Sequence, residues 1–191
     1  PVEIRDQLTR YLSSDEKERA SKFKFAIHRN YFVVARGVLR TLLAAYLDTS
    51  PKQIEFGYAT NQKPYVNAPI SAPPLYFNLS HSGELAVFAF GYVRELGIDI
   101  EEMKPGYSAE DIAKQFFAPD EVRKLQSIPN KSRDAAFFRC WTRKEAFIKA
   151  RGDGLSLALD SFVVSLLEEE SPRLLHTHFY PPEAQNWRLY D

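Results

Sequence analysis

The sequence has very little cysteine and no excess of either charge. Its 191 residues include one cysteine, Cys140, which excludes an internal disulfide and a metal site made of cysteines alone. The 25 Lys and Arg residues equal the 25 Asp and Glu residues, so bulk positive charge does not hold this chain on nucleic acid. The longest uncharged stretch, 64–83, is broken by prolines and polar residues and cannot span a bilayer. We expect a cytoplasmic globular protein without nucleic-acid or membrane partners.

The zero net charge conceals a division along the chain. Residues 1–64 carry 11 basic and 7 acidic residues, whereas the remainder carries 14 basic and 18 acidic ones. Segment 19–47 has six basic residues and no acidic one. These charges are typical of solvated helix faces, but they also suit the attraction of a polyanionic substrate or an acidic protein partner.

The order of hydrophobic patterns predicts an α+β protein. No Gly/Ser or Pro linker separates the mixed segments, so we expect tightly packed halves at 1–93 and 94–191. The chain begins at Pro1 rather than methionine, and we expect a trimmed form. Helices are predicted from Ser13 and at 28–47, 109–117, 121–126 and 134–151, and strands at 54–59, 75–79, 85–90, 96–100 and 159–167.

The long helix predicted at 28–47 has two distinct faces. One face gathers the apolar residues and predicts its buried side. Arg29, Arg36 and Arg40 follow an opposite stripe, which is typical of a solvent face. The apolar face consists of Tyr31, Val34, Val38, Leu39, Leu42 and Tyr46.

Two acidic residues alternate with isoleucines in Gly97-Ile98-Asp99-Ile100-Glu101. In a strand, Asp99 and Glu101 point to one side while Ile98 and Ile100 enter the core. Two adjacent carboxylates repel each other unless a cation or a proton lies between them. The pair is therefore either a solvated strand end or half of a metal site.

Residues 141–149 place Trp141, Glu145 and Lys149 on one stripe of a helix, four residues apart. Glu145 and Lys149 form an ordinary surface ion pair in one interpretation. In the other, Glu145 joins Asp99 and Glu101 around a hard cation such as Mg²⁺, and Lys149 contacts a phosphate oxygen.

Three other groups of polar residues need an interpretation. Ser80 and His81 follow a predicted strand and are either ordinary turn residues or donors to a phosphate. His176 and His178 alternate on a strand without a third zinc ligand, so we interpret them as structural. Cys140 lies in an apolar helix and is expected to be buried and inert.

Three motifs together resemble those of the 4′-phosphopantetheinyl transferases, in the larger type named for the surfactin-synthesis enzyme. Gln62-Lys63-Pro64 is similar to a G-K-P turn of that family, with Gln in place of Gly, and 14–19 is similar to its early helix. The motifs are F-N-L-S-H-S-G at 77–83, G-I-D-I-E at 97–101 and F-x-x-x-W-T-x-K-E-A-F-I-K-A-x-G-x-G-L at 137–155.

The resemblance implies a fold of two similar α+β halves in a pseudo-dimeric monomer. It also implies a holo-[carrier protein] synthase, which transfers phosphopantetheine from coenzyme A to a serine of an apo acyl or peptidyl carrier protein and releases 3′,5′-ADP. The implied magnesium ligands are Asp99, Glu101 and Glu145, with Glu145, Lys149 and His81 as catalytic residues. The implied coenzyme A contacts are Arg19, Lys63, Asn78, Ser80, His81 and Lys149, with Arg36 as a weaker candidate.

Two other functions use the same residues. A magnesium-dependent phosphohydrolase with the same three acids would consume coenzyme A without a carrier protein. A binding module without activity would have no reason to keep Asp99, Glu101, Glu145 and Lys149 together, which argues against that class.

Overall fold

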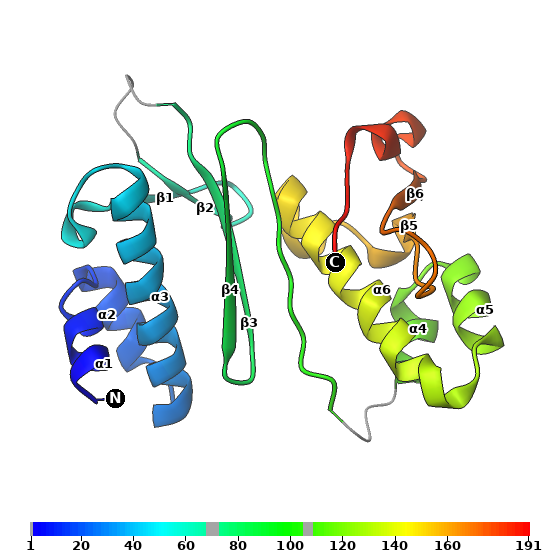
Figure 1. Cartoon of the computed structure of the whole chain (residues 1–191), viewed down its shortest axis with the longest axis horizontal. Helices are drawn as coiled ribbons and strands as arrows, with labels where there is room; N and C mark the ends of the chain where they lie inside the picture. The colour runs from blue at the N-terminus through cyan, green and yellow to red at the C-terminus, as the bar shows by residue number, and fades with distance from the viewer. Residues whose placement is uncertain (1, 68–72, 105–108) are drawn as a thin grey trace. The chain divides into compact units, whose positions relative to one another are not determined.

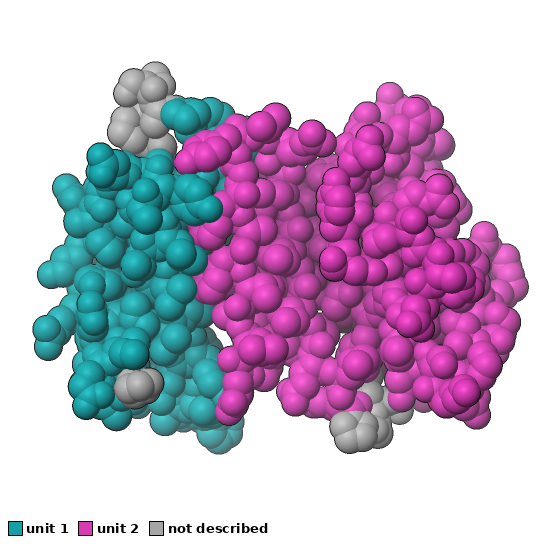
Figure 2. Space-filling model, viewed as in Figure 1, with its two compact units in different colours: residues 1–59, 64–76 teal, residues 60–63, 77–191 magenta. Residues whose placement is uncertain are grey.

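The computed structural model describes residues 2–67, 73–104 and 109–191. Unit 1 contains residues 1–59 and 64–76, and unit 2 contains 60–63 and 77–191 (Figure 2). Each unit combines helices with small two-stranded sheets (Figure 1), so the predicted α+β class is confirmed. Among the described residues, the helices are too short or too polar to cross a membrane.

Unit 1 consists of three helices followed by a short hairpin. α1 and α2 pack against the long helix α3, and Gly37 of α3 allows α1 to approach because a side chain there would overlap Leu8. The antiparallel strands β1 and β2 pair Gly57 with Tyr65. The elements are α1 (Val2–Thr9), α2 (Ser14–Ser21), α3 (Ala26–Tyr46), the 3₁₀ helix η1 (Pro51–Gln53), β1 (Phe56–Tyr58) and β2 (Pro64–Val66).

The prediction that Arg29, Arg36 and Arg40 lie on a solvent face of α3 is wrong for two of the three. Arg36 and Arg40 are buried, whereas Arg29 is exposed. Both buried guanidinium groups donate to the carboxylate of Glu16, which lies in α2 and is itself 3% exposed. Each buried guanidinium thus has an acidic partner inside the unit, although one carboxylate offsets only one of the two positive charges. Val34 and Tyr46, predicted to be buried, are exposed instead.

Except for Tyr76, the hairpin of β3 (Tyr76–Ser82) and β4 (Leu85–Gly91) belongs to unit 2. Its two-residue turn places Gly83 at a φ of 57°, a conformation that favours glycine. β3 extends three residues further than predicted, so Ser80 and His81 belong to the strand rather than to the turn. The strand predicted at 96–100 is wrong, because residues 95–104 are extended without belonging to a sheet.

The rest of unit 2 packs around helix α6 (Figure 1). Phe137, Cys140 and Phe147 of α6 lie in an apolar core with Phe162, and Gly152 ends the helix at a φ of 78°, as predicted. Cys140 is buried, as predicted, and burial raises the pKa of its thiol well above its usual range. The elements are α4 (Ala109–Phe116), α5 (Pro119–Ser127), α6 (Asn130–Arg151), η2 (Gly154–Ser156), η3 (Leu159–Ser161), β5 (Phe162–Val164), β6 (Leu174–Thr177) and η4 (Pro181–Asn186).

Candidate functional site

Alternate residues of β3 hold the extended segment that carries the two acids. The Asn78 Oδ1 accepts the backbone N–H of Ile98 at 2.9 Å, and the Ser80 hydroxyl donates to Asp99 Oδ1 at 2.8 Å. The Ser82 hydroxyl donates to Glu101 Oε2, also at 2.8 Å. Because successive side chains of a strand point to opposite faces, the three residues share one face of β3. Side-chain hydrogen bonds from β3 therefore hold the segment that was predicted to be a strand.

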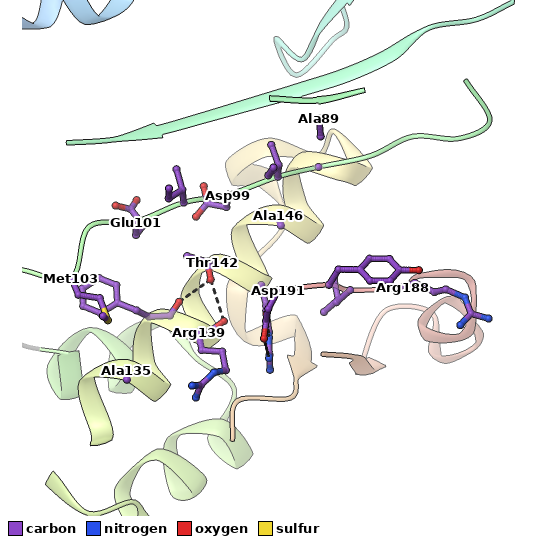
Figure 3. A pocket seen from close by; sticks show the side chains of 17 residues that line it. Ala89, Asp99, Glu101, Met103, Ala135, Arg139, Thr142, Ala146, Arg188 and Asp191 are labelled. Atoms are coloured by element: carbon purple, nitrogen blue, oxygen red, sulfur yellow. Dashed lines mark hydrogen bonds and ion pairs between the residues drawn. The ribbon is translucent and has the colours of Figure 1, made fainter. Parts of the chain in front are cut away.

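A glycine brings the same segment against α6. A side chain at Gly97 would overlap the carbonyl oxygen of Ala146 and the backbone nitrogen of Ala150. Only glycine permits this approach, and two residues later the chain presents Asp99 beside the stripe of α6 that carries Glu145 and Lys149. Figure 3 shows the extended segment running along the helix.

Most of the predicted residues of unit 2, but not Asn78 or Lys63, line one cavity of about 390 Å³. Three carboxylates, a lysine, a serine and a histidine line it together with two apolar residues. Residues of the three motifs, which are far apart in the sequence, thus line one cavity. The lining residues are Leu79, Ser80, His81, Asp99, Glu101, Trp141, Glu145 and Lys149.

Asp99 is the most buried acid of the cavity, with its side chain 4% exposed. Its Oδ1 accepts hydrogen bonds from the Lys149 ammonium at 2.5 Å and from the Ser80 hydroxyl at 2.8 Å. Its Oδ2 is buried and has no hydrogen-bond partner among the described residues. A buried carboxylate oxygen without a donor is costly, so Oδ2 is a position where a bound cation would compensate charge.

The electrostatics of Glu145 show how close the three acids are. Burial raises the pKa of Glu145, and the negative charges of Asp99 and Glu101 raise it further, while Lys149 opposes them. Such a raised pKa is typical of a carboxylate that lies near other carboxylates. Among residues 2–67, 73–104 and 109–191, however, no three His, Cys, Asp or Glu side chains already stand in a metal-binding arrangement.

A larger groove of about 800 Å³ is also lined by residues of the 97–103 segment (Figure 3). Asp99 and Glu101 line both spaces, so the acid cavity and the groove are adjacent. The groove is mostly apolar and reaches from Met103 to the last residues of the chain, including Tyr190 and Asp191.

The remaining predicted residues lie outside the acid cavity. The Lys63 ammonium is bound by the Glu95 carboxylate and by the Ala150 carbonyl at the end of α6. In unit 1, Arg19 is exposed and its guanidinium lies over the Phe32 ring, 5.4 Å from the centroid. Arg36, as described above, is buried against Glu16.

Sequence reasoning missed one polar residue of the site. The Ser82 hydroxyl also accepts the backbone N–H of Glu102 at 3.0 Å, so this serine fixes the segment at both Glu101 and Glu102. The signal for it was the alternation Asn78-Leu79-Ser80-His81-Ser82, because a strand there puts three polar side chains on one face.

Comparisons with known proteins found two family models that match this chain. The family model described as "4'-phosphopantetheinyl transferase superfamily" matches residues 95–190, and the model "4'-phosphopantetheinyl transferase, N-terminal" matches residues 4–91. Together the two models cover nearly all of the chain.

Three relatives carry the name 4′-phosphopantetheinyl transferase. HetI of Nostoc sp. is 42% identical over 85% of this chain and 68% of its own length. A Bacillus subtilis enzyme is 37% identical over 86% of this chain and 70% of its own. Sfp of Bacillus subtilis is 30% identical over 87% of this chain and 72% of its own length. This match agrees with the resemblance to the larger type. This chain belongs to the 4′-phosphopantetheinyl transferase superfamily.

Proposed function

We propose that this protein transfers the 4′-phosphopantetheine group of coenzyme A to a serine of an apo carrier protein. The observation that supports it most is the convergence of Asp99, Glu101 and Glu145 with Lys149 and His81 in one cavity. In the reaction, the serine hydroxyl oxygen attacks the phosphorus that bears the pantetheine arm. The bond from that phosphorus to the bridging pyrophosphate oxygen breaks, and 3′,5′-ADP leaves.

The three acids fit a hard divalent cation such as Mg²⁺. Mg²⁺ prefers oxygen ligands such as carboxylates, and Asp99 Oδ2 is a buried oxygen for which the described part of the chain supplies no donor. Asp99, Glu101 and Glu145 would hold the ion. When bound, it neutralises charge on the pyrophosphate of the substrate and on the leaving nucleotide.

The side chains of the cavity supply the remaining functions. Lys149 contributes a positive charge for a phosphate oxygen, and it already lies within 2.8 Å of Ser80. His81, exposed at the cavity, donates a hydrogen bond to the same phosphates. Glu145 accepts the proton of the attacking serine, directly or through water. Ser80 and Asn78 of β3 complete the coenzyme A contacts.

The nucleotide end of coenzyme A is assigned to basic residues outside the cavity. Arg19 is exposed and has no acidic partner among the described residues, so it is free to contact the 3′-phosphate. Lys63 is assigned to the nucleotide, although Glu95 and Ala150 now hold its ammonium. Arg36 is the weaker candidate, because Glu16 and Tyr58 already bind its guanidinium.

The proposal also covers the division of the protein into two halves. Two similar halves, 1–93 for the nucleotide contacts and 94–191 for the magnesium site and catalytic helix, form a pseudo-dimeric monomer that works in the cytoplasm. The matches of separate family models to 4–91 and 95–190 support this division. Its products are holo carrier proteins for fatty-acid, polyketide or peptide synthesis.

The experiment measures release of 3′,5′-ADP from coenzyme A, with and without an apo carrier protein. We expect release only with the carrier, whereas a phosphohydrolase would release nucleotide without it. Glu145→Gln is expected to lower the rate by about a hundredfold or more, because a metal ligand and proton acceptor is lost. Glu84→Gln, which removes an exposed carboxylate from the β3–β4 turn, is the matched control. Wild-type rates in Glu145→Gln would contradict the site assignment.

A further inference from the structure

Ser82, the last residue of β3, contacts the segment that carries the acids but has no task in the proposed chemistry. Its hydroxyl donates to Glu101 Oε2 at 2.8 Å and accepts the backbone N–H of Glu102 at 3.0 Å. Unlike Ser80 and His81, Ser82 does not line the acid cavity. It therefore reaches that cavity through Glu101, which does line it.

The two hydrogen bonds of Ser82 fix the direction of its hydroxyl proton. A serine hydroxyl has one proton to donate and lone pairs that accept. Because the Glu102 N–H points at the hydroxyl oxygen, the proton is directed away from that group and toward the Glu101 carboxylate. Hydrogen bonds in such a chain also polarise and strengthen one another. Ser82 thus connects the backbone of the segment to one particular carboxylate oxygen.

Glu101 depends on this contact more than the other two acids of the cavity do. Asp99 is buried and paired with Lys149, and Glu145 is part of helix α6. Glu101 is exposed and lies on a segment outside any sheet (Figure 3), and among the described residues only Ser82 donates a side-chain hydrogen bond to it. An exposed glutamate has several rotatable bonds, so fixing it at a ligand costs conformational entropy.

The same spacing relates both serines of β3 to the acids. Ser80 and Asp99 are 19 residues apart, and so are Ser82 and Glu101. A step of two residues along β3 thus meets a step of two along the acid segment, and each acid has its own serine donor. Ser80 lines the cavity itself, whereas the Ser82 hydroxyl hydrogen-bonds to the acid segment alone among the described residues.

We propose that Ser82 is a positioning residue that holds the Glu101 carboxylate for the divalent cation, an inference that rests on the proposed transferase function and its magnesium site. With Oε2 bound to the serine, Oε1 is left for the cation, and no hydrogen bond reaches Oε1 from the described residues. Partners of this kind orient the ligands of a metal, and their loss typically weakens metal binding by about 10- to 100-fold. Because Ser82 is half-buried rather than buried, we expect the lower end of this range.

Binding of Mn²⁺ tests this role without turnover. The protein is titrated with Mn²⁺ in the presence of coenzyme A and without a carrier protein, and electron paramagnetic resonance measures the free ion. Ser82→Ala removes the hydroxyl, and Ser82→Thr keeps it in a residue that suits a strand. Ser127→Ala is the matched control, because it removes an exposed hydroxyl of α5 that does not line the cavity. Circular dichroism checks that each variant is folded.

We expect Ser82→Ala to raise the dissociation constant for Mn²⁺ by about tenfold, and Ser82→Thr and Ser127→Ala to stay within about twofold of wild type. In the transfer assay, Ser82→Ala should need about tenfold more Mg²⁺ to reach half of its maximal rate. At saturating Mg²⁺ its kcat should return to near the wild-type value, because all three carboxylates are still present.

An unchanged dissociation constant for Mn²⁺ in Ser82→Ala overturns the proposal, and an equal loss in Ser82→Thr does so too, because the hydroxyl is then not the cause. A kcat of Ser82→Ala that stays low at saturating Mg²⁺ also overturns it, since Ser82 then holds the whole segment rather than the Glu101 carboxylate. If the wild type binds Mn²⁺ with this dependence on Ser82 but modifies no carrier protein, the positioning role stands and the transferase function fails.

Discussion

Lys144 of α6 is fully buried. Replacing it tests how much its ion pair and hydrogen bonds stabilise unit 2. Its side chain is 0% exposed and pairs with Glu121 of α5, which is 1% exposed, at 2.8 Å. The ammonium also donates to the carbonyl oxygens of Leu159 at 2.8 Å and Phe162 at 2.6 Å. Glu121 in turn accepts the backbone N–H of Val164 at 2.8 Å. The pair thus connects α6, α5 and β5.

Lys144→Met keeps the length of the side chain but removes its charge. Glu121 then remains buried as a carboxylate without a cation, and two carbonyl oxygens lose their donor. Breaking a buried pair in this way costs about 3–5 kcal/mol of the free energy of unfolding. The double variant Glu121→Gln/Lys144→Met removes the stranded charge as well, so we expect it to be about 2 kcal/mol more stable than Lys144→Met alone.

Urea unfolding followed by tryptophan fluorescence measures this effect. Both tryptophans, Trp141 and Trp187, lie in unit 2, so their fluorescence reports on the unit that contains the pair. Lys131→Met, at an exposed position of the same helix, is the control. A free energy of unfolding for Lys144→Met within about 1 kcal/mol of wild type would refute the reasoning, because the expected penalty for a stranded buried charge is several times larger.

Three further predictions concern other parts of the chain. Arg19→Ala should raise the KM for coenzyme A more than that for 3′-dephospho-coenzyme A, and equal effects in the same assay would refute its phosphate contact. Gln62→Gly should raise the free energy of unfolding by about 0.5–1 kcal/mol in urea, because Gln62 has a φ of 63° that favours glycine; a loss of stability would contradict this. For Glu16, burial favours a higher pKa, but hydrogen bonds from Arg40, the Ser13 N–H and Arg36 outweigh it and lower the pKa. As the pH falls below about 4.3, the unfolded chain therefore binds a proton at Glu16 more readily than the folded chain does. Glu16 contributes its full stabilisation above that pH and loses it as the pH falls further. Circular dichroism should show a steeper acid loss of stability in wild type than in Glu16→Gln, and parallel curves would count against the pairing.

Local patterns predicted most of the helices from the sequence. The ends of α6 and α3 follow from a glycine after the helix and from a turn ending in proline, which are local signals. The residues that line the acid cavity were named from the sequence because their motifs resemble those of the 4′-phosphopantetheinyl transferases.

The failures concern partners that are distant in the sequence. Nothing local to Arg36 and Arg40 shows that Glu16, 20 and 24 residues earlier, accepts hydrogen bonds from both of them inside unit 1. The segment 96–100 has the alternation of a strand, but the side chains of β3 replace the ladder that alternation predicts. In both cases a side-chain contact took the place of the expected secondary-structure or solvent contact.

The measurement that tests the central claim most directly is intact-mass spectrometry of an apo carrier protein incubated with this protein, coenzyme A and Mg²⁺. We predict that the carrier gains the mass of one phosphopantetheine group, and that Asp99→Asn, which alters the most buried acid of the cavity, prevents the gain. An unchanged carrier mass across acyl, polyketide and peptidyl carrier proteins, with the wild-type protein folded, would contradict the account.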